Sequence, residues 1–283
     1  VSPWGGPAAK PCLRTMPNNL TLALWQTPHP ASTAEALRRL DATCAQARAQ
    51  GADLLVTPEM FITGYAIGAD RVAALAEPAD GPMAQAVAAI ARHHGIAIVY
   101  GYPELYRDGR RYNAAQFIDA DGTQRASYRK THLFGDLDRA QFSAGDAASR
   151  VFEWRGWKLG LLICYDVEFP EAVRGLALQG ADAVLVPTAN MEPFDEVQRV
   201  LLPARALENN LYLAYANACR SEGTLAYNGR SCTIGPDGGV REQAGKDERR
   251  LISRRDAAAL QHRRPHSQLP GRRPDLYSPL ANR

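Results

Sequence analysis

The feature that most constrains the fold of this chain is the alternation of short apolar runs with segments of helical periodicity. Ser32 and Glu35 form a capping signature, and apolar residues then recur at helical spacing to about Ala49. Residues 119–122 (Asp-Ala-Asp-Gly) instead indicate a hairpin between two strand-like runs. Because strands alternate with helices but hairpins are interleaved, the pattern predicts a mixed α/β layered domain rather than an all-parallel sheet.

The same patterns give approximate bounds for the elements. We expect helices over residues 36–49, 82–94, 170–179 and 192–210. The expected strands cover residues 20–26, 53–57, 96–102, 112–118, 125–129, 151–154, 158–164, 183–187, 211–217, 231–234 and 240–242. We predict a flexible leader over residues 1–17, one domain over residues 18–255 and a basic tail over residues 256–283.

Several classes of function are disfavoured by what the chain lacks. Its longest apolar stretches, such as residues 159–164, are far shorter than the ~20 residues of a membrane span, and the leader has no apolar signal core. The five cysteines are odd in number, widely spaced and without zinc-site spacing. We therefore expect a reduced cytoplasmic protein with no membrane partner, no metal and no cofactor.

The small positive charge of the chain comes from its ends. The net charge is +3, yet residues 246–283 alone hold ten Lys and Arg against four acidic residues. A basic composition favours nucleic-acid binding only when the charge gathers on a folded face, and the tail has little aromatic interleaving. We expect no nucleic-acid partner and predict that the tail packs at a subunit interface.

Three segments place a reactive side chain at or near the end of a strand-like run. The first is Glu59, which follows the run 53–57 and is embedded among apolar residues. A solvated loop carboxylate is the plain alternative. Burial would raise the pKa of Glu59 and suit it to general-base work.

The second segment contains Lys130, one of only four lysines in a chain that otherwise uses arginine. An isolated lysine is usually a surface residue. Lysine is, however, a compact cation with a tunable pKa, a role that arginine cannot fill at a catalytic site.

The third segment contains Cys164, at the end of the run 158–164. A cysteine in this position is most often a buried structural thiol. The turn and helix that follow would aim backbone N–H groups at Cys164, lowering its pKa and offering an oxyanion site. A Cys–His thiol enzyme with His132 or His93 as base stays open as an alternative.

Together these segments carry a family resemblance. Pro58-Glu59, residues 129–133 (Arg-Lys-Thr-His-Leu) and residues 163–171 (Ile-Cys-Tyr-Asp-Val-Glu-Phe-Pro-Glu), in this order, resemble the nitrilase superfamily of carbon–nitrogen hydrolases. Residues 186–190, 205–209 and 273–277 extend the resemblance over essentially residues 20–280. It implies a four-layer α-β-β-α sandwich and, by family habit, a symmetric homodimer.

The resemblance also implies roles for the residues. Cys164 would be the nucleophile, Glu59 the general base and acid, and Lys130 the oxyanion partner beside the backbone N–H of Tyr165. The family often has a second catalytic glutamate, and the matching position here, counted back from residues 142–145, is Asp138. Aspartate is one methylene shorter, so Asp138 could instead position Lys130 or water, or be a surface residue.

The residues around the cysteine favour one branch of the family. Tyr165-Asp166 follows Cys164, where nitrile-hydrolysing members typically have Trp-Glu, so the chain is most similar to stereoselective amidases acting on small carboxamides. Motif position alone suggests that Tyr65, Asp166, Asn190 and Met191 line the substrate pocket. An N-carbamoyl amino acid amidohydrolase, a nitrilase and a catalytically silent interaction module of the same fold remain alternatives.

Overall fold

Alternating side chains on β1 (Leu20–Gln26) pack into two different apolar clusters. Leu22 and Leu24 belong to a cluster that continues into a second sheet, whereas Ala23 and Trp25 pack with helices on the opposite face. Successive side chains of a strand point to opposite faces, so a strand that is apolar on both must be covered on both. β1 therefore lies in an interior layer.

The computed structural model describes residues 19–281, so the predicted leader lies outside the described residues. The strands are β1 (Leu20–Gln26), β2 (Leu54–Val56), β3 (Ala97–Leu105), β4 (Arg111–Ile118), β5 (Gln124–Arg129), β6 (Phe152–Trp154), β7 (Trp157–Leu161), β8 (Ala183–Thr188), β9 (Tyr212–Asn217), β10 (Cys219–Glu222), β11 (Leu225–Asn228), β12 (Cys232–Ile234), β13 (Val240–Gln243) and β14 (Arg249–Arg255). The α-helices are α1 (Thr33–Ala49), α2 (Ala69–Leu75), α3 (Pro82–His94), α4 (Gly135–Gln141), α5 (Pro170–Leu178), α6 (Leu202–Asn209), α7 (Ala257–Arg263) and α8 (Pro274–Ala281). Shorter turns of other helix types are η1 (Cys164–Glu168), η2 (Val197–Leu201), η3 (Arg264–His266) and η4 (Leu269–Gly271).

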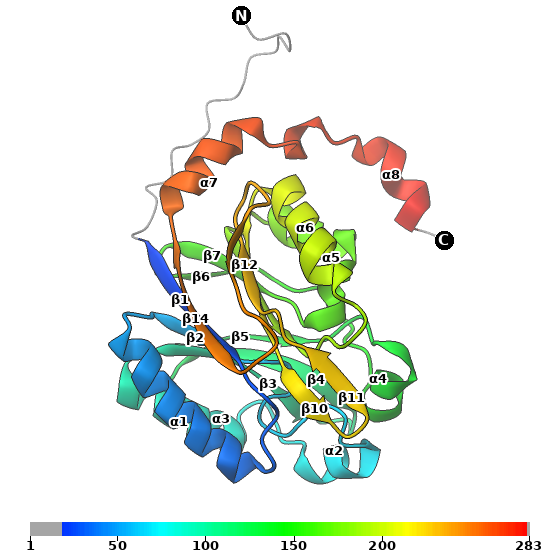
Figure 1. The fold of residues 1–283 in the computed structure, drawn as a ribbon. Coiled ribbons are helices and arrows are strands. Elements are labelled where there is room, and N and C mark those ends of the chain that lie inside the picture. Colours follow the sequence, from blue (N-terminus) through cyan, green and yellow to red (C-terminus); the bar gives the residue numbers. More distant parts are fainter. Residues whose placement is uncertain (1–18, 282–283) are drawn as a thin grey trace, which may run out of the picture.

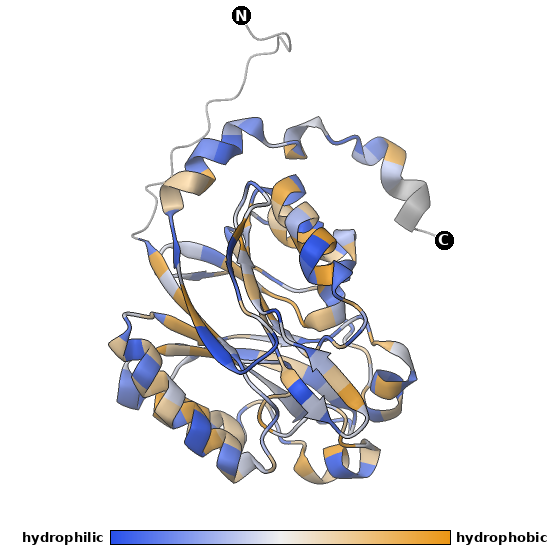
Figure 2. Ribbon diagram, in the orientation of Figure 1, coloured by the Kyte–Doolittle hydropathy of each residue, from blue (hydrophilic) through white to orange (hydrophobic). Residues whose placement is uncertain are grey.

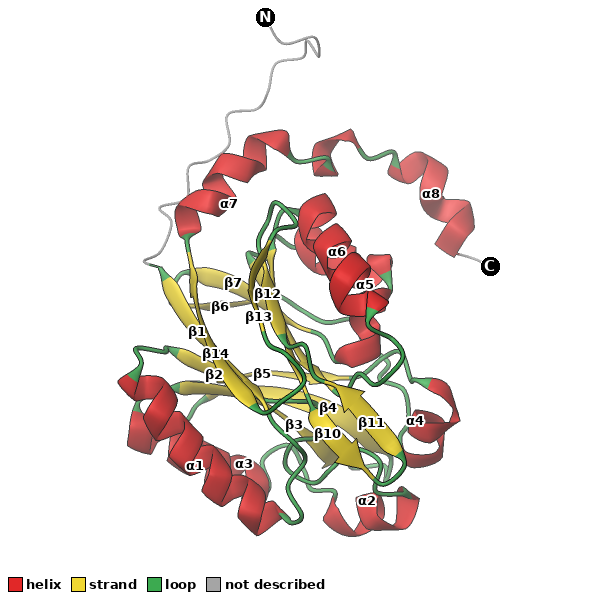
Figure 3. Cartoon of the chain, viewed as in Figure 1, coloured by secondary structure: helices red, strands yellow, loops and turns green. Residues whose placement is uncertain are grey.

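Two six-stranded sheets face each other through the main apolar core. Their strand orders are β14-β1-β2-β3-β4-β5 and β13-β12-β9-β8-β7-β6. The runs β1-β2-β3 and β7-β8-β9 are parallel, and the flanking strands pair antiparallel. Helices α1 and α3 cover the outer face of the first sheet, and α5 and α6 cover that of the second (Figures 1 and 3). The predicted four-layer α-β-β-α fold is confirmed.

The covering helices are amphipathic, as this layering requires. In α3 the buried residues Met83, Val87 and Ala91 recur at helical spacing. Figure 2 shows orange and blue stretches alternating along the helices of both outer layers. None of the helices within residues 19–281 is long and apolar enough to cross a membrane.

The structure differs from the predicted elements in a few segments. The predicted strand 158–164 ends at Leu161, and residues 164–168 form the 3-10 turn η1. The predicted helix 192–210 begins only at Val197, because residues 190–196 form a loop instead. The sequence analysis did not predict helices α2 and α4, the hairpin β10–β11 or strand β14. The predicted tail is largely helical, with α7 and α8 running beyond α5 and α6 in Figure 1.

Candidate active site

Glu59, Lys130 and Cys164 reach one place from two different sheets. Glu59 follows β2 and Lys130 follows β5, both in the first sheet, whereas Cys164 follows β7 in the second. The two sheets touch here directly, because the backbone N–H of Glu59 donates to the carbonyl of Thr188 at the end of β8, at 3.2 Å. The candidate site therefore lies at the seam between the sheets.

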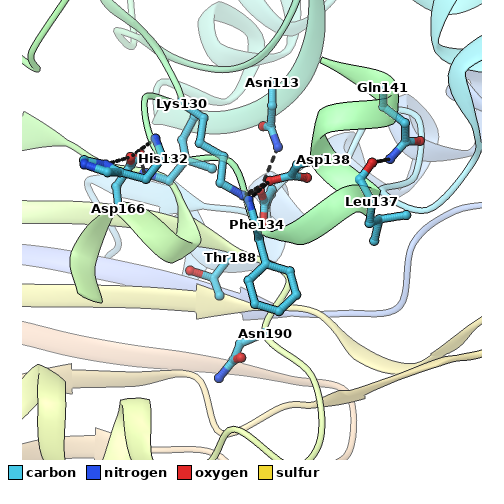
Figure 4. A network of polar contacts seen from close by, with 12 residues as sticks. Asn113, Lys130, His132, Phe134, Leu137, Asp138, Gln141, Asp166, Thr188 and Asn190 are labelled. Carbon is cyan, nitrogen blue, oxygen red and sulfur yellow. Dashed lines mark hydrogen bonds and ion pairs between the residues drawn. The ribbon is translucent and has the colours of Figure 1, made fainter. Parts of the chain in front are cut away.

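A buried lysine joins two buried carboxylates at this seam. The Lys130 Nζ lies 2.7 Å from Glu59 Oε1 and 2.7 Å from Asp138 Oδ2, and all three side chains are fully shielded from solvent. Figure 4 shows Lys130 pointing toward Asp138 on α4. Asn113 on β4 donates from Nδ2 to the same Glu59 oxygen at 2.7 Å, and the N–H of Phe134 donates to Asp138 Oδ2 at 2.8 Å. These contacts fix the three charged groups relative to the first sheet.

The charges of this cluster shift one another's protonation. Burial raises the pKa of Glu59, the Lys130 ammonium opposes that rise and the Asp138 carboxylate adds to it. Burial alone would lower the pKa of Lys130, but the neighbouring Glu59, Tyr65 and Asp138 bring it well above its ordinary value. Lys130 is therefore a cation, beside a carboxylate that can take and return a proton.

One oxygen of each of the Glu59 and Asp138 carboxylates has no hydrogen-bond partner among the described residues. Glu59 Oε2 and Asp138 Oδ1 are buried and have no hydrogen-bond partner within the part of the chain that the structure describes. A buried acceptor without a donor costs stability, and such groups gather at functional sites. Glu59 Oε2 is thus free to accept a proton from a reacting group.

Cys164 adopts a backbone conformation that side chains rarely take. Its φ is +46°, in the left-handed region, at the point where β7 gives way to η1. Strain of this kind persists only where the surroundings fix it, and it is common at reactive residues. The residue as a whole is 9% exposed. Burial, followed by the Glu59 charge, raises the pKa of the thiol, while the Lys130 charge and the backbone of Ala189 lower it. The net shift is upward, so the lowered pKa expected from the turn after Cys164 is wrong.

The Cys164 side chain borders a cavity of about 270 Å³ between the ends of the two sheets. Such a volume is at the small end for a ligand site. The lining residues are Tyr65, Phe134, Cys164, Tyr165, Glu168, Ala189, Asn190, Met191, Phe194 and Glu196. Three of the four residues predicted to bind substrate, Tyr65, Asn190 and Met191, are among them.

Asp166, the fourth residue predicted to bind substrate, is not part of the cavity lining. Its carboxylate is fully buried and accepts from the side chain and N–H of Thr131 (3.0 and 3.3 Å) and from the N–H of His132 (3.0 Å). It also accepts from the Tyr128 hydroxyl (3.0 Å) and the Ile163 N–H (3.1 Å). Asp166 therefore ties η1 to the loop that follows Lys130, and it does not line the cavity.

Two polar networks hold the cavity wall. Glu222 on β10 accepts the N–H groups of Tyr65 and Ala66 at 2.8–3.2 Å, which fixes the loop that carries the Tyr65 ring. Asn190 donates from Nδ2 to the carbonyl of Phe194 at 2.8 Å, and Asn217 accepts the Asn190 N–H at 2.7 Å. These contacts set residues 190–196 in the loop that replaces the start of the predicted helix.

The two histidines proposed as alternative bases lie away from the cavity lining. The His132 ring stacks on Phe169 at 3.9 Å between centroids, and its Nδ1 lies 2.8 Å from Asp166 Oδ1. His93 is exposed near the end of α3, in the outer helical layer. Of the candidate bases, Glu59 is the one that contacts Lys130.

The sequence analysis missed several residues of the site. Asn113 is a fully buried amide on β4, which also carries the buried amide of Gln116, and polar residues within this strand-like run were the available signal. Glu168 and Glu196 line the cavity, but nothing local distinguishes them from solvated glutamates. Within residues 19–281 there is no group of three or more His, Cys, Asp or Glu side chains placed to hold a metal ion.

Comparison with known proteins adds independent information. Residues 21–263 match the model of a family described as carbon-nitrogen hydrolase. The chain is 51% identical to "Hydrolase in pqqF 5'region" of Pseudomonas protegens, over 93% of both chains, and 38% identical to an (R)-stereoselective amidase of Pseudomonas sp, over 82% of both. A mutant of the amidase from Nesterenkonia sp. AN1, with an acetamide moiety added covalently at its active-site cysteine, superimposes with a TM-score of 0.76. It is 38% identical, and the match covers 87% of this chain and 94% of that one.

Proposed function

The chain belongs to the carbon–nitrogen hydrolase family, and from this premise we propose that it hydrolyses small carboxamides to carboxylate and ammonia through a thioester on Cys164. The observation that carries the proposal is the buried Lys130, held 2.7 Å from both Glu59 and Asp138, together with a cavity that Cys164 lines. The cavity of about 270 Å³ suits a substrate of few atoms.

Acylation begins with proton transfer from the Cys164 thiol to Glu59. The free Glu59 Oε2 is the acceptor, and the thiolate sulfur attacks the amide carbon to give a tetrahedral intermediate. Because the pKa of the thiol is raised by burial, proton transfer and attack are best coupled rather than preceded by a stable thiolate.

The negative oxygen of that intermediate needs donors that are already in place. A lysine ammonium has three N–H donors, and Lys130 uses two of them on Glu59 and Asp138 among the described residues. The third is left for the oxyanion, beside the backbone N–H of Tyr165 at the start of η1. Asp138 then serves as a positioning residue that aims the ammonium.

The carbon–nitrogen bond breaks when Glu59 returns its proton to the amide nitrogen, which leaves as ammonia. Water attacks the resulting thioester and gives its proton to Glu59, and the Cys164 sulfur leaves and recovers a proton. No redox partner enters either half-reaction.

The decisive experiment measures ammonia release from simple amides, N-carbamoyl amino acids and nitriles. We expect release from small amides by the wild-type chain and by the control Cys219→Ala, and none by Cys164→Ala. Intact mass should find an acyl adduct on the wild-type chain and none on Cys164→Ala. Nitriles alone as substrates would refute the amidase branch, carbamoyl compounds alone would favour the carbamoylase, and no turnover would favour a silent module.

The choice of base has its own test. Glu59→Gln should abolish turnover, whereas His132→Ala should retain most of it because the His132 ring stacks on Phe169 and its Nδ1 lies 2.8 Å from Asp166 Oδ1 rather than beside Lys130. Loss of turnover in His132→Ala with turnover retained in Glu59→Gln would instead favour a Cys–His mechanism. The homodimer and the cytoplasmic location expected from the sequence stay predictions; light scattering on the purified chain tests the first.

A further inference from the structure

The cavity has a charge pattern that the proposed hydrolysis does not use. Two of its lining residues, Glu168 and Glu196, are acidic, and none of its lining residues is basic. Glu168 is half-buried at the end of η1, four residues after Cys164, and Glu196 is exposed at the start of η2. The two carboxylates thus belong to the same cavity as the thiol.

Neither carboxylate is neutralised by a direct contact. Within residues 19–281, the Glu168 and Glu196 side chains make no hydrogen bond or ion pair of the kind that holds Glu59 and Asp138. Arg205 donates to the backbone carbonyls of Glu168 (2.7 Å) and Val167 (3.3 Å) and pairs with the side chain of Glu208. Lys130 is committed to its own two carboxylates. The cavity therefore carries excess negative charge.

The surroundings of Glu168 also shift its protonation. Burial, and then the Glu196 charge, raises the pKa of Glu168 to about 7, against weaker opposing effects of Lys130 and Arg205. A bound cation would relieve this repulsion, whereas an anionic substrate would add to it. Aromatic rings also line the cavity, with Phe134 5.4 Å from Tyr165 and 5.8 Å from Phe194 between centroids, and ring faces attract cations.

We propose that Glu168 and Glu196 bind a positively charged amine on the acyl side of the substrate, so that the protein prefers aminoamides over neutral or anionic amides of equal size. The inference rests on the proposed amidase function and adds a substrate class to it. Glu168 is the stronger determinant because it is the more buried, and solvent screens Glu196.

Three amides of nearly equal size test the proposal: 3-aminopropanamide (cationic), butyramide (neutral) and malonamate (anionic). We expect wild-type kcat/KM to favour the cation over butyramide by about tenfold or more at pH 8, and malonamate to be the poorest. The ratio should fall as the pH drops through about 7, where Glu168 gains a proton. Over this range the substrate amine stays largely protonated.

Substitutions assign the preference to the two residues. Glu168→Gln should reduce the cation-to-neutral ratio about tenfold and Glu196→Gln about threefold. Glu242→Gln, an equivalent change on the exposed strand β13, should leave the ratio unchanged. A wild-type ratio near one, a preference for malonamate, or a ratio unaffected by Glu168→Gln would overturn the inference while leaving amide hydrolysis intact. Absence of ammonia from all three substrates would instead remove the proposed function, and the inference with it.

Discussion

Replacing Asp138 with asparagine should shift the acid limb of the pH–activity profile to lower pH. Asparagine keeps the shape of the side chain and can still accept from Lys130, but it removes one of the two negative charges beside the ammonium. The variant therefore separates the charge of Asp138 from its packing.

The magnitude follows from the geometry of the cluster. Each bonded carboxylate oxygen lies 2.7 Å from Lys130 Nζ, so the two oxygens are at most about 5 Å apart, and at an effective dielectric constant of about 20 their repulsion is about 3 kcal/mol. That repulsion favours the protonated form of Glu59 and contributes to its raised pKa. Without that repulsion the pKa of Glu59 falls.

The sign of the shift in activity follows from the role of Glu59. Acylation requires the Glu59 carboxylate as base, so kcat/KM declines as the pH falls through the pKa of Glu59. A lower pKa extends activity to more acidic pH. At the plateau we expect kcat to fall about 10- to 100-fold, because Lys130 is aimed less firmly at the oxyanion.

The assay is ammonia release from butyramide between pH 4 and 9. Asp136→Asn is the matched control, since Asp136 is exposed in the first turn of the same helix α4. An acid limb that stays in place or moves to higher pH in Asp138→Asn would refute the electrostatic reasoning, and an equal shift in Asp136→Asn would show that the effect is not local.

Three further substitutions probe the framework of the site, and urea unfolding with butyramide turnover measures each. Asp166→Ala should lower the free energy of unfolding by about 3 kcal/mol and remove most of the activity, because several buried donors lose their acceptor. A stable and active variant would contradict the role of Asp166 in joining η1 to the loop after β5. Gly101→Ala should lower the free energy of unfolding by about 1–3 kcal/mol and displace Glu59, because the new Cβ would lie 2.3 Å from the Met60 nitrogen. An unchanged kcat would show that Glu59 is not displaced. Arg255→Met should raise the free energy of unfolding by about 1–3 kcal/mol, because the guanidinium is fully buried without a hydrogen-bond partner among residues 19–281. A loss of stability would show that the packing of Arg255 over the Tyr212 ring outweighs the cost of burying its charge.

The parts of the fold that local pattern predicts are those that local forces decide. β1 has its predicted bounds because it is a nearly continuous apolar run, and α3 has its predicted bounds because its buried residues recur at helical spacing and Gly95 ends it. The chain departs from the prediction where distant contacts prevail. β7 ends three residues before Cys164. There the Asp166 carboxylate accepts the N–H of Ile163, and it also accepts the hydroxyls of Tyr128 on β5 and Thr131 in the loop after β5.

The same distinction applies to the candidate site. Glu59 and Cys164 stood out because each follows or ends an apolar run, and Lys130 stood out because lysine is rare in this chain. Their proximity followed from family resemblance rather than from spacing. Asp138 lies on a helix of seven residues that has no side-chain cap, so its element was not predicted. Glu196 faces the cavity because an amide network among Asn190, Asn217 and Gln198 sets the loop before η2, and no local pattern encodes that network.

The pairing of β14 with β1 has a consequence for how the protein is made. β1 is synthesised more than 200 residues before β14, the strand that covers one of its edges and pairs with it along its whole length. Until then an apolar edge of the first sheet is open to other chains. Nascent chains that already contain Glu59, Lys130 and Cys164 are thus still incomplete, and premature termination before residue 249 yields a product prone to aggregate rather than a shorter enzyme.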